Sequence, residues 1–248
     1  MTERSSRIQI VVPCFNEAER FDSAGFERAL AGRADLSFVL VNDGSTDETS
    51  AVLRTLADRC PARVEVLEQP NNAGKAEAVR QGMLLAFDRG AEMAGYWDAD
   101  LATPLDAIGD FASVLESEPE VDLVLGARVA MLGHSIERSA TRHYAGRVFA
   151  TFASMTLGLS VYDTQCGAKL LRCTERIRAL FAEPFGSRWV FDVELLARYL
   201  ETGGAPSGIR ELPLARWSDV QGSKVKPLDF AAGLLELMRI KRRYPRGR

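Results

Sequence analysis

The stretch Met93-Ala-Gly-Tyr-Trp-Asp-Ala-Asp-Leu101 joins a short apolar run to two aspartates, Asp98 and Asp100. Such a run is typical of a buried β-strand, and the turn after it lets both carboxylates reach one ion. Mg²⁺ or Mn²⁺ suits this oxygen-only site, because the cation takes few protein carboxylates and completes its shell with phosphate oxygens and water. Acidic residues after a strand also cap helices, so the rest of the chain must decide between a metal site and a cap.

Short apolar runs alternate with helical stretches through the first half of the chain. The predicted strands are residues 8–12, 36–41, 64–67, 93–97 and 121–125. This alternation predicts an α/β fold, a Rossmann-like and mostly parallel sheet with helices on both faces. In such sheets, ligands bind at the carboxyl ends of the strands.

Polar residues follow each of these strands. They are Asn16 and Glu17, Asp43, Lys75, the Asp98/Asp100 pair, and Arg128. Each of them alone could be a cap or turn residue. Because they follow separate strands, we expect them to converge on one edge of the sheet and form a ligand site there.

Composition excludes several classes of protein. The 248 residues carry a net charge of −3, which argues against a general nucleic-acid binder. The two histidines make a histidine zinc site or a Ser-His-Asp triad improbable, and the four cysteines lack paired metal spacing. Without a signal peptide or an apolar stretch of about 18 residues, we expect a cytoplasmic protein whose membrane contact is peripheral. Nothing in the sequence predicts an oligomeric state.

The second half differs in character. Residues 138–159 have a helical pattern with an apolar face, Tyr144, Val148, Phe152, Met155 and Leu159. Such a face covers a core or lies in a membrane interface. Pro227 opens a final amphipathic helix, and residues 239–248 contain six basic residues and no acid, which fits either a solvated tail or attraction to an anionic membrane. We expect one domain over residues 1–248, with a ligand-binding half at 7–130, a second half at 131–230 and a basic tail at 231–248.

Three motifs carry a family resemblance. Val11-Val-Pro-Cys-Phe-Asn-Glu17, Val41-Asn-Asp-Gly-Ser-Thr-Asp47 and Asp98-Ala-Asp100 resemble the inverting family 2 glycosyltransferases of GT-A fold. Later motifs at 163–167, 188–194 and 222–224 are similar to those of polyprenyl-phosphate sugar synthases, especially the dolichyl-phosphate β-glucosyltransferase branch. The resemblance covers about residues 7–230. Two features depart from it: transmembrane helices that several bacterial relatives append are missing here, and Ala168 stands where an aromatic residue is frequent.

The resemblance implies roles for individual residues. A nucleotide-sugar donor would contact Pro13, Asn16, Glu17, Asp43, Lys75, Asp98, Arg128 and Lys224, and Asp98 and Asp100 would bind the metal. An acceptor phosphate would lie near Arg138, Arg142 and Arg147. The implied reaction moves a sugar, with UDP-glucose the expected donor, onto a polyprenyl phosphate at the membrane surface.

Alternatives remain at this point. A family 2 transferase with a saccharide or protein hydroxyl acceptor would need a general base, for which Asp192 and Glu194 are the candidates. Spaced two apart on one helix, these two carboxylates should not share a face. A sugar nucleotidyltransferase is disfavoured because its glycine-rich loop is missing after the first strand. A catalytically dead nucleotide-sugar binder is disfavoured by the intact Asp98/Asp100 pair.

Overall fold

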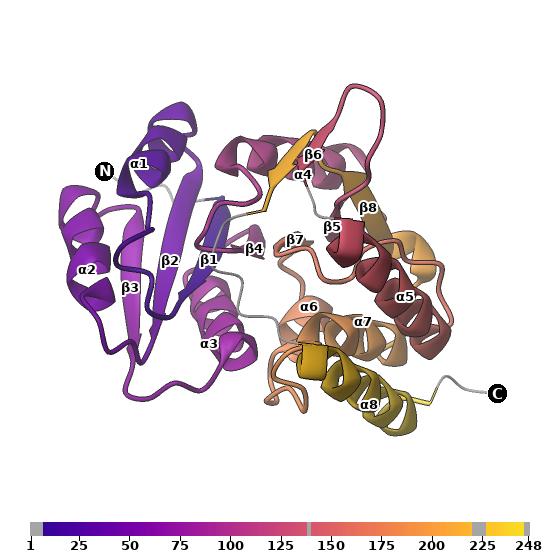
Figure 1. Cartoon of the computed structure of the whole chain (residues 1–248). Helices are drawn as coiled ribbons and strands as arrows, with labels where there is room; N and C mark the ends of the chain where they lie inside the picture. The colour runs from indigo at the N-terminus through magenta and orange to yellow at the C-terminus, as the bar shows by residue number, and fades with distance from the viewer. Residues whose placement is uncertain (1–6, 138–139, 220–226, 246–248) are drawn as a thin grey trace.

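The computed structural model describes residues 7–137, 140–219 and 227–245, the side chains at 140–143, 145 and 227–231 excepted. A seven-stranded sheet runs through it in the order β3-β2-β1-β4-β7-β5-β8 (Figure 1). Its strands are β1 (Ile8–Cys14), β2 (Leu36–Asp43), β3 (Val64–Gln69), β4 (Met93–Trp97), β5 (Leu123–Ala127), β7 (Ala168–Arg172) and β8 (Ile209–Pro213). The predicted α/β fold with a mostly parallel sheet is therefore confirmed.

One strand runs against the others. β7 pairs antiparallel with β4 on one side and with β5 on the other, whereas β8 pairs parallel with β5. A second, two-stranded sheet joins β6 (Ser135–Glu137) to β9 (Arg216–Ser218). Only two residues separate the end of β8 at Pro213 from the start of β9 at Arg216.

The helices cover both faces of the large sheet (Figure 1). One face packs against α1 (Ser23–Gly32), α2 (Thr49–Arg59) and α4 (Ile108–Ser117), which follows the 3₁₀ turn Leu105–Ala107. The other packs against α3 (Lys75–Asp88), α6 (Glu175–Leu180) and α7 (Phe191–Glu201), the last followed by the 3₁₀ turn Pro206–Gly208. Because both faces are covered, β1 and β2 are buried along nearly their whole length, which explains their near-continuous apolar sequence.

Two further helices, α5 (Ala140–Leu157) and α8 (Pro227–Arg243), pack against each other and against α7. Phe149, Ala153 and Leu157 of α5 join the core, as do Leu237 and Ile240 of α8. The apolar face predicted for α5 from the sequence is not the face that joins the core. Tyr144, Val148, Phe152 and Met155 are 44% to 71% exposed, so this stripe does not cover the core; only Leu159, beyond the helix end, packs partly against it.

None of the helices in the described ranges is long and apolar enough to cross a membrane.

The strand order places a switch point beside β1. The chain builds outward from β1 to β2 and β3, then returns to place β4 on the other side of β1. A crevice forms at the carboxyl ends of neighbouring strands at such a point. Lys75, Asp98 and Asp100, three of the residues predicted to form the site, lie together at this edge of the sheet.

Candidate functional site

Asp98 and Asp100 follow β4 directly, as the sequence predicts. The backbone N–H of Asp98 donates to the carbonyl of Gly167, 3.0 Å away, and its Oδ1 lies 2.5 Å from Lys75 Nζ. Asp100 Oδ1 accepts a hydrogen bond from the backbone N–H of Ala102 at 3.1 Å. Burial raises the pKa of Asp100, and the nearby Asp98 carboxylate raises it further. A cation bound here would therefore relieve repulsion between two half-buried acids.

Lys75 begins α3 and reaches back across the crevice to Asp98. Burial lowers the pKa of Lys75, but the carboxylates of Asp98, Asp192 and Asp100 outweigh that effect, and the pKa is raised. Lys75 therefore stays charged and partly neutralises Asp98. The predicted proximity of Lys75 to the aspartate pair is confirmed.

Gly167 packs directly against the first aspartate. A Cβ atom at Gly167 would lie 1.8 Å from Asp98 Oδ2, a distance at which one of the two groups must move. Only glycine therefore allows the backbone to approach this carboxylate so closely.

The donor atoms at this site fit a hard divalent cation. No group of three or more histidine, cysteine, aspartate and glutamate side chains lies close enough to hold a metal among the residues that the structure describes. A cation would be held by Asp98 and Asp100 only, with other ligand positions open. Mg²⁺ and Mn²⁺ accept that arrangement when phosphate oxygens and water complete the shell.

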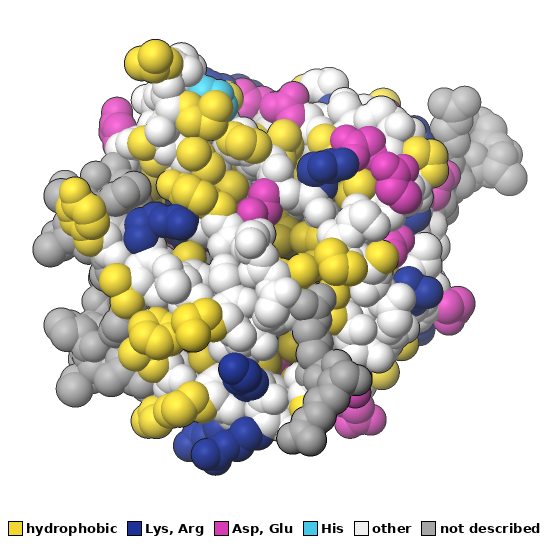
Figure 2. Space-filling view, turned by 90° about the vertical axis from the view of Figure 1, so that its right-hand side faces the viewer, with side chains coloured by type: hydrophobic (Ala, Val, Ile, Leu, Met, Phe, Trp, Pro, Cys, Tyr) yellow, Lys and Arg dark blue, Asp and Glu magenta, His cyan; other side chains and the backbone are white. Residues whose placement is uncertain are grey.

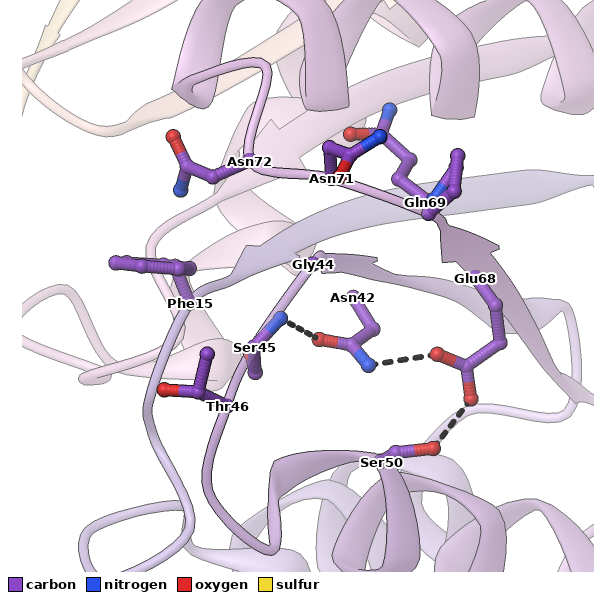
Figure 3. A pocket seen from close by; sticks show the side chains of 11 residues that line it. Phe15, Asn42, Gly44, Ser45, Thr46, Ser50, Glu68, Gln69, Asn71 and Asn72 are labelled. Atoms are coloured by element: carbon purple, nitrogen blue, oxygen red, sulfur yellow. Dashed lines mark hydrogen bonds between the residues drawn. The ribbon is translucent and has the colours of Figure 1, made fainter.

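A pocket of about 590 Å³ opens at the carboxyl ends of β1, β2 and β3 (Figure 3). Its lining is largely polar and comprises Phe15, Asn42, Gly44, Ser45, Thr46, Ser50, Glu68, Gln69, Pro70, Asn71 and Asn72. Asn42 links two walls: its Oδ1 accepts from Ser45 N at 3.1 Å and its Nδ2 donates to Glu68 Oε2 at 2.6 Å. The volume lies within the usual range of small-ligand sites.

Asn16, Glu17 and Asp43 brace the loops around the pocket. Asn16 adopts a φ of 53°, which asparagine tolerates, and its Oδ1 accepts from Thr46 N at 2.9 Å. The Glu17 carboxylate pairs with Arg20. Both Asp43 oxygens accept backbone N–H groups, from Ala73 at 2.7 Å and Gly74 at 2.9 Å. Pro13, also predicted here, lies inside β1 opposite Val41.

Burial raises the pKa of Asp43, while the two N–H donors of the loop before α3 partly oppose that effect. The carboxylate thus fixes the loop that forms one wall of the pocket. Its predicted contact with a nucleobase or ribose remains a prediction.

Of the predicted phosphate-binding basic residues, two have protein partners and three have side chains outside the described residues. Arg128 forms a paired contact with Asp163, with Nε and Nη2 2.6 and 2.8 Å from the two carboxylate oxygens, and lies over the Trp217 ring. Arg147 donates to the Tyr162 carbonyl at 3.0 Å and stacks on the Tyr162 ring. Both cations therefore have protein partners. Arg138, Lys224 and the side chain of Arg142 lie outside the described residues.

Asp192 lies in a buried charged cluster behind the aspartate pair. Its Oδ1 is 2.6 Å from Lys169 Nζ and accepts the hydroxyl of Tyr96 at 2.5 Å. Lys169 is fully buried and also donates to the Cys166 carbonyl at 2.6 Å. Burial raises the pKa of Tyr96 well above its usual value, and Asp192 adds to the effect. Asp192 is thus paired by two groups rather than open to the crevice.

Glu194 faces another way, as the spacing predicts. Its Oε2 accepts the backbone N–H groups of Gly186 and Ser187 at 2.8 and 3.1 Å, and its Oε1 pairs with Arg198 at 2.9 Å and accepts from Tyr244. With an exposed fraction of 1%, it holds the loop before α7 rather than a reacting group. Neither carboxylate of α7 is arranged as a general base.

Sequence reasoning missed three residues that the structure brings into this region: Phe15 in the pocket wall, Lys169 paired with Asp192, and Arg188 over the loop before α3. Phe15 stands next to Asn16 in a motif already singled out, so an aromatic residue directly after a strand was the available signal. Lys169 could not be recognised in the sequence, because a lone lysine in a mostly apolar strand gives no sign of its partner.

A carboxylate pair at the end of β4, on the same sheet edge as a pocket at the ends of β1 to β3, is the architecture of the GT-A class of glycosyltransferases. The chain belongs to glycosyl transferase family 2, whose family model matches residues 9–176.

Relatives and solved structures agree with this assignment. The chain is 34% identical to a dolichyl-phosphate beta-glucosyltransferase of Drosophila melanogaster over 90% of its own length and 70% of the relative's. It is 30% identical to a protein of Trichomonas vaginalis with the same activity in its name, over 93% of this chain and 69% of the other. Glucosyl-3-phosphoglycerate synthase of Mycobacterium tuberculosis has the same fold, with a TM-score of 0.68 at 17% identity over 96% of this chain and 80% of that one.

Proposed function

We propose that this protein transfers a sugar from a nucleotide-sugar donor, with UDP-glucose the expected one, to a polyprenyl phosphate at a membrane surface. The observation that carries the proposal is that the Asp98/Asp100 pair and a polar pocket of about 590 Å³ lie at the carboxyl ends of strands of one sheet. The named activity of relatives up to 34% identical supports the acceptor. The use of a divalent metal is supported by the solved synthase of the same fold, which binds Mn²⁺ together with UDP.

The residues present fit such a donor. The nucleoside would occupy the pocket lined by Phe15 and Asn42, with the diphosphate directed to Asp98 and Asp100. Mg²⁺ or Mn²⁺, when bound, would neutralise the charge that develops on the departing diphosphate. Lys75, already beside Asp98, would contribute a second positive charge to the same region.

The choice of acceptor is supported by the ion pairs of the two carboxylates on α7. A hydroxyl acceptor needs a base to remove its proton, whereas a phosphate monoester is already an anion near neutral pH. Asp192 and Glu194 are both engaged in buried ion pairs, with Lys169 and Arg198 respectively. The structure therefore favours an acceptor that needs no base over the hydroxyl alternative.

The direct test is transfer from radiolabelled UDP-glucose, with Mn²⁺ or Mg²⁺, to a short-chain polyprenyl phosphate in detergent. We expect label in the organic phase. The matched control acceptor is the corresponding polyprenol, which has the same chain but no phosphate and should remain unlabelled. Label on the polyprenol, or transfer only to water-soluble hydroxyl acceptors, would contradict the proposal.

Phe15 gives a prediction for donor binding. Replacing it with alanine (Phe15→Ala) removes the aromatic ring from the pocket wall, and stacking of a base on an aromatic side chain is worth about 1–3 kcal/mol. We expect UDP to bind roughly tenfold more weakly in isothermal titration calorimetry with Mn²⁺ present. Phe152→Ala, a change at a half-exposed phenylalanine on α5, is the matched control and should bind UDP normally. Equal UDP affinity in both variants would exclude a base at this wall.

A membrane surface would dock on the face formed by α5, α8 and Trp189, which we call the apolar face. Its exposed members are Tyr144, Val148, Phe152, Met155, Trp189, Leu235 and Met238, each 41% to 71% exposed. Figure 2 shows hydrophobic side chains gathered over this side of the molecule, with lysine and arginine side chains at its lower edge. The last turn of α8 supplies Lys241, Arg242 and Arg243. Apolar side chains bordered by cations match an anionic lipid surface.

Neutralising part of this border tests the docking. Lys241 and Arg242 are both exposed, and each should contribute about 1 kcal/mol near an anionic surface. The double variant Lys241→Ala/Arg242→Ala should bind vesicles of phosphatidylcholine and phosphatidylglycerol about 30-fold more weakly in sedimentation. The control, Arg54→Ala/Arg89→Ala, removes two exposed arginines elsewhere on the molecule. Equal loss in both double variants would mean that net charge alone, not this border, attracts the protein.

A further inference from the structure

The segment before α7 lies between the nucleotide pocket and the apolar face. Arg188 and Trp189 are neighbours in sequence but project to different places. A Cβ atom at Gly74, just before α3, would lie 2.9 Å from Arg188 Nε, whereas one at Gly233 of α8 would lie 3.5 Å from the Trp189 ring. Two consecutive side chains therefore touch the pocket wall and the apolar face.

Arg188 is placed where a donor's phosphates would pass. Its Nη2 lies 3.3 Å from the side-chain oxygen of Asn72, which lines the pocket. Two residues after Asn72 comes Gly74, under the guanidinium, and then Lys75, whose ammonium group touches Asp98. The guanidinium is therefore available to an anion that extends from the pocket toward Lys75.

Arg188 lies near one carboxylate without pairing with it: its charge opposes the rise in the pKa of Asp43, but both Asp43 oxygens already accept backbone N–H groups. Among the residues that the structure describes, Arg188 forms no ion pair, whereas Arg128 and Arg198 are each paired with a buried acid. Its guanidinium also lies over the amino end of α3, where the helix dipole disfavours a cation. An anion bound between them would remove that conflict and would use the planar donors of arginine.

Hydrogen bonds of the neighbouring Ser187 fix the segment that carries Arg188. Ser187 is 2% exposed; its backbone N–H donates to Glu194, its hydroxyl donates to Glu236 of α8, and that hydroxyl also accepts from Val190 N at 2.8 Å. Glu236 belongs to the same helix that presents Leu235 and Met238 on the apolar face. The position of Arg188 therefore depends on where α8 lies.

We propose that Arg188 binds the diphosphate of the nucleotide donor and that Glu236 is a positioning residue, holding the loop so that Arg188 reaches it. The proposal rests on the proposed function, because it requires a nucleotide diphosphate in the pocket. It adds a donor contact from the second half of the chain, delivered by a loop attached to the membrane-facing helix.

The test compares two ligands that differ only in phosphate. UDP and uridine are titrated by calorimetry into full-length wild type, Arg188→Ala and Arg188→Lys, with Mn²⁺ present. We expect Arg188→Ala to bind UDP about tenfold to a hundredfold more weakly, Arg188→Lys to lie between, and uridine affinity to stay unchanged. Arg210→Ala, at a surface arginine paired with Glu118, is the control and should bind both ligands normally.

Each other outcome is decisive. If uridine binding falls as much as UDP binding, Arg188 supports the pocket wall through Asn72 and the phosphate contact is wrong. If Arg188→Ala leaves UDP binding intact but raises the KM for the lipid acceptor, the arginine belongs to the acceptor phosphate. Failure of the wild-type protein to bind UDP at all would instead overturn the proposed function.

Glu236 is tested by a double-mutant cycle. Glu236→Ala should weaken UDP binding about threefold to fivefold in the wild-type background and have no further effect in Arg188→Ala, because the glutamate acts through the arginine. Additive losses in the two backgrounds would show that Glu236 only stabilises α8, and would remove the link between that helix and the donor.

Discussion

Replacing Asp100 with asparagine should reduce sugar transfer by at least about a thousandfold while the protein remains folded. The substitution keeps the shape of the side chain and its oxygen facing Ala102 N, but removes the negative charge. With only Asp98 and Asp100 available to hold a cation in the described site, loss of one carboxylate leaves the metal a single charged ligand. Asp98→Asn should behave in the same way and in addition leave Lys75 without its partner.

The measurement is kcat against Mn²⁺ concentration, alongside circular dichroism melting. Asp110→Asn, at an exposed aspartate on α4, is the matched control and should retain full activity. Because charge removal between two neighbouring acids relieves repulsion, Asp100→Asn should melt no lower than wild type. Undiminished transfer by Asp100→Asn would show that this pair does not hold the metal on which catalysis depends.

Lys169→Met should lower the free energy of unfolding by about 3–5 kcal/mol. The change removes a fully buried cation and leaves Asp192, which is 5% exposed, as an uncompensated buried charge. It also removes the donor to the Cys166 carbonyl, in the segment that carries Gly167 to the backbone of Asp98. For a chain of this size the expected fall in Tm is about 10 °C.

A second variant separates charge imbalance from lost packing. Lys169→Met/Asp192→Asn removes both charges, and we expect it to recover much of the lost stability, because the penalty comes from the unpaired carboxylate. Lys241→Met, at an exposed lysine of α8, serves as the control and should melt near wild type. If the double variant were less stable than Lys169→Met, the cluster would contribute a net attraction, and the stated cause of the destabilisation would be wrong.

Much of the fold could be predicted from periodicity. Strands β1, β2, β4 and β5 are compact apolar runs, because a sheet covered on both faces leaves no polar side to alternate with. The direction and place of β7 could not be read, since its partners β4 and β5 lie far away in the chain and pairing depends on non-local contacts. Helix α5 was predicted at the right place, but sequence could not tell which of its two apolar faces meets the core.

The site, like the fold, could be predicted only where it depends on strand topology. Lys75, Asp98 and Asp100 follow strands of one sheet edge, so their convergence follows from topology and is confirmed by the contact between Lys75 and Asp98. A carboxylate in a helix, in contrast, looks the same in sequence whether it is free or paired. Glu194 did have a visible partner four residues on, Arg198, but the partner of Asp192 comes from another strand.

The hydrogen bond from Asp98 N to the Gly167 carbonyl has a consequence for recombination between family members. A crossover near residue 130 would look natural, because it separates the strands that line the pocket from α5, α8 and the apolar face. It would nevertheless exchange Gly167 and all of β7, which pairs with β4 from Met93 to Trp97. A chimera made there inherits the Asp98/Asp100 pair from one parent and the backbone that supports it from the other, so the second half of the chain cannot be transplanted as an independent module.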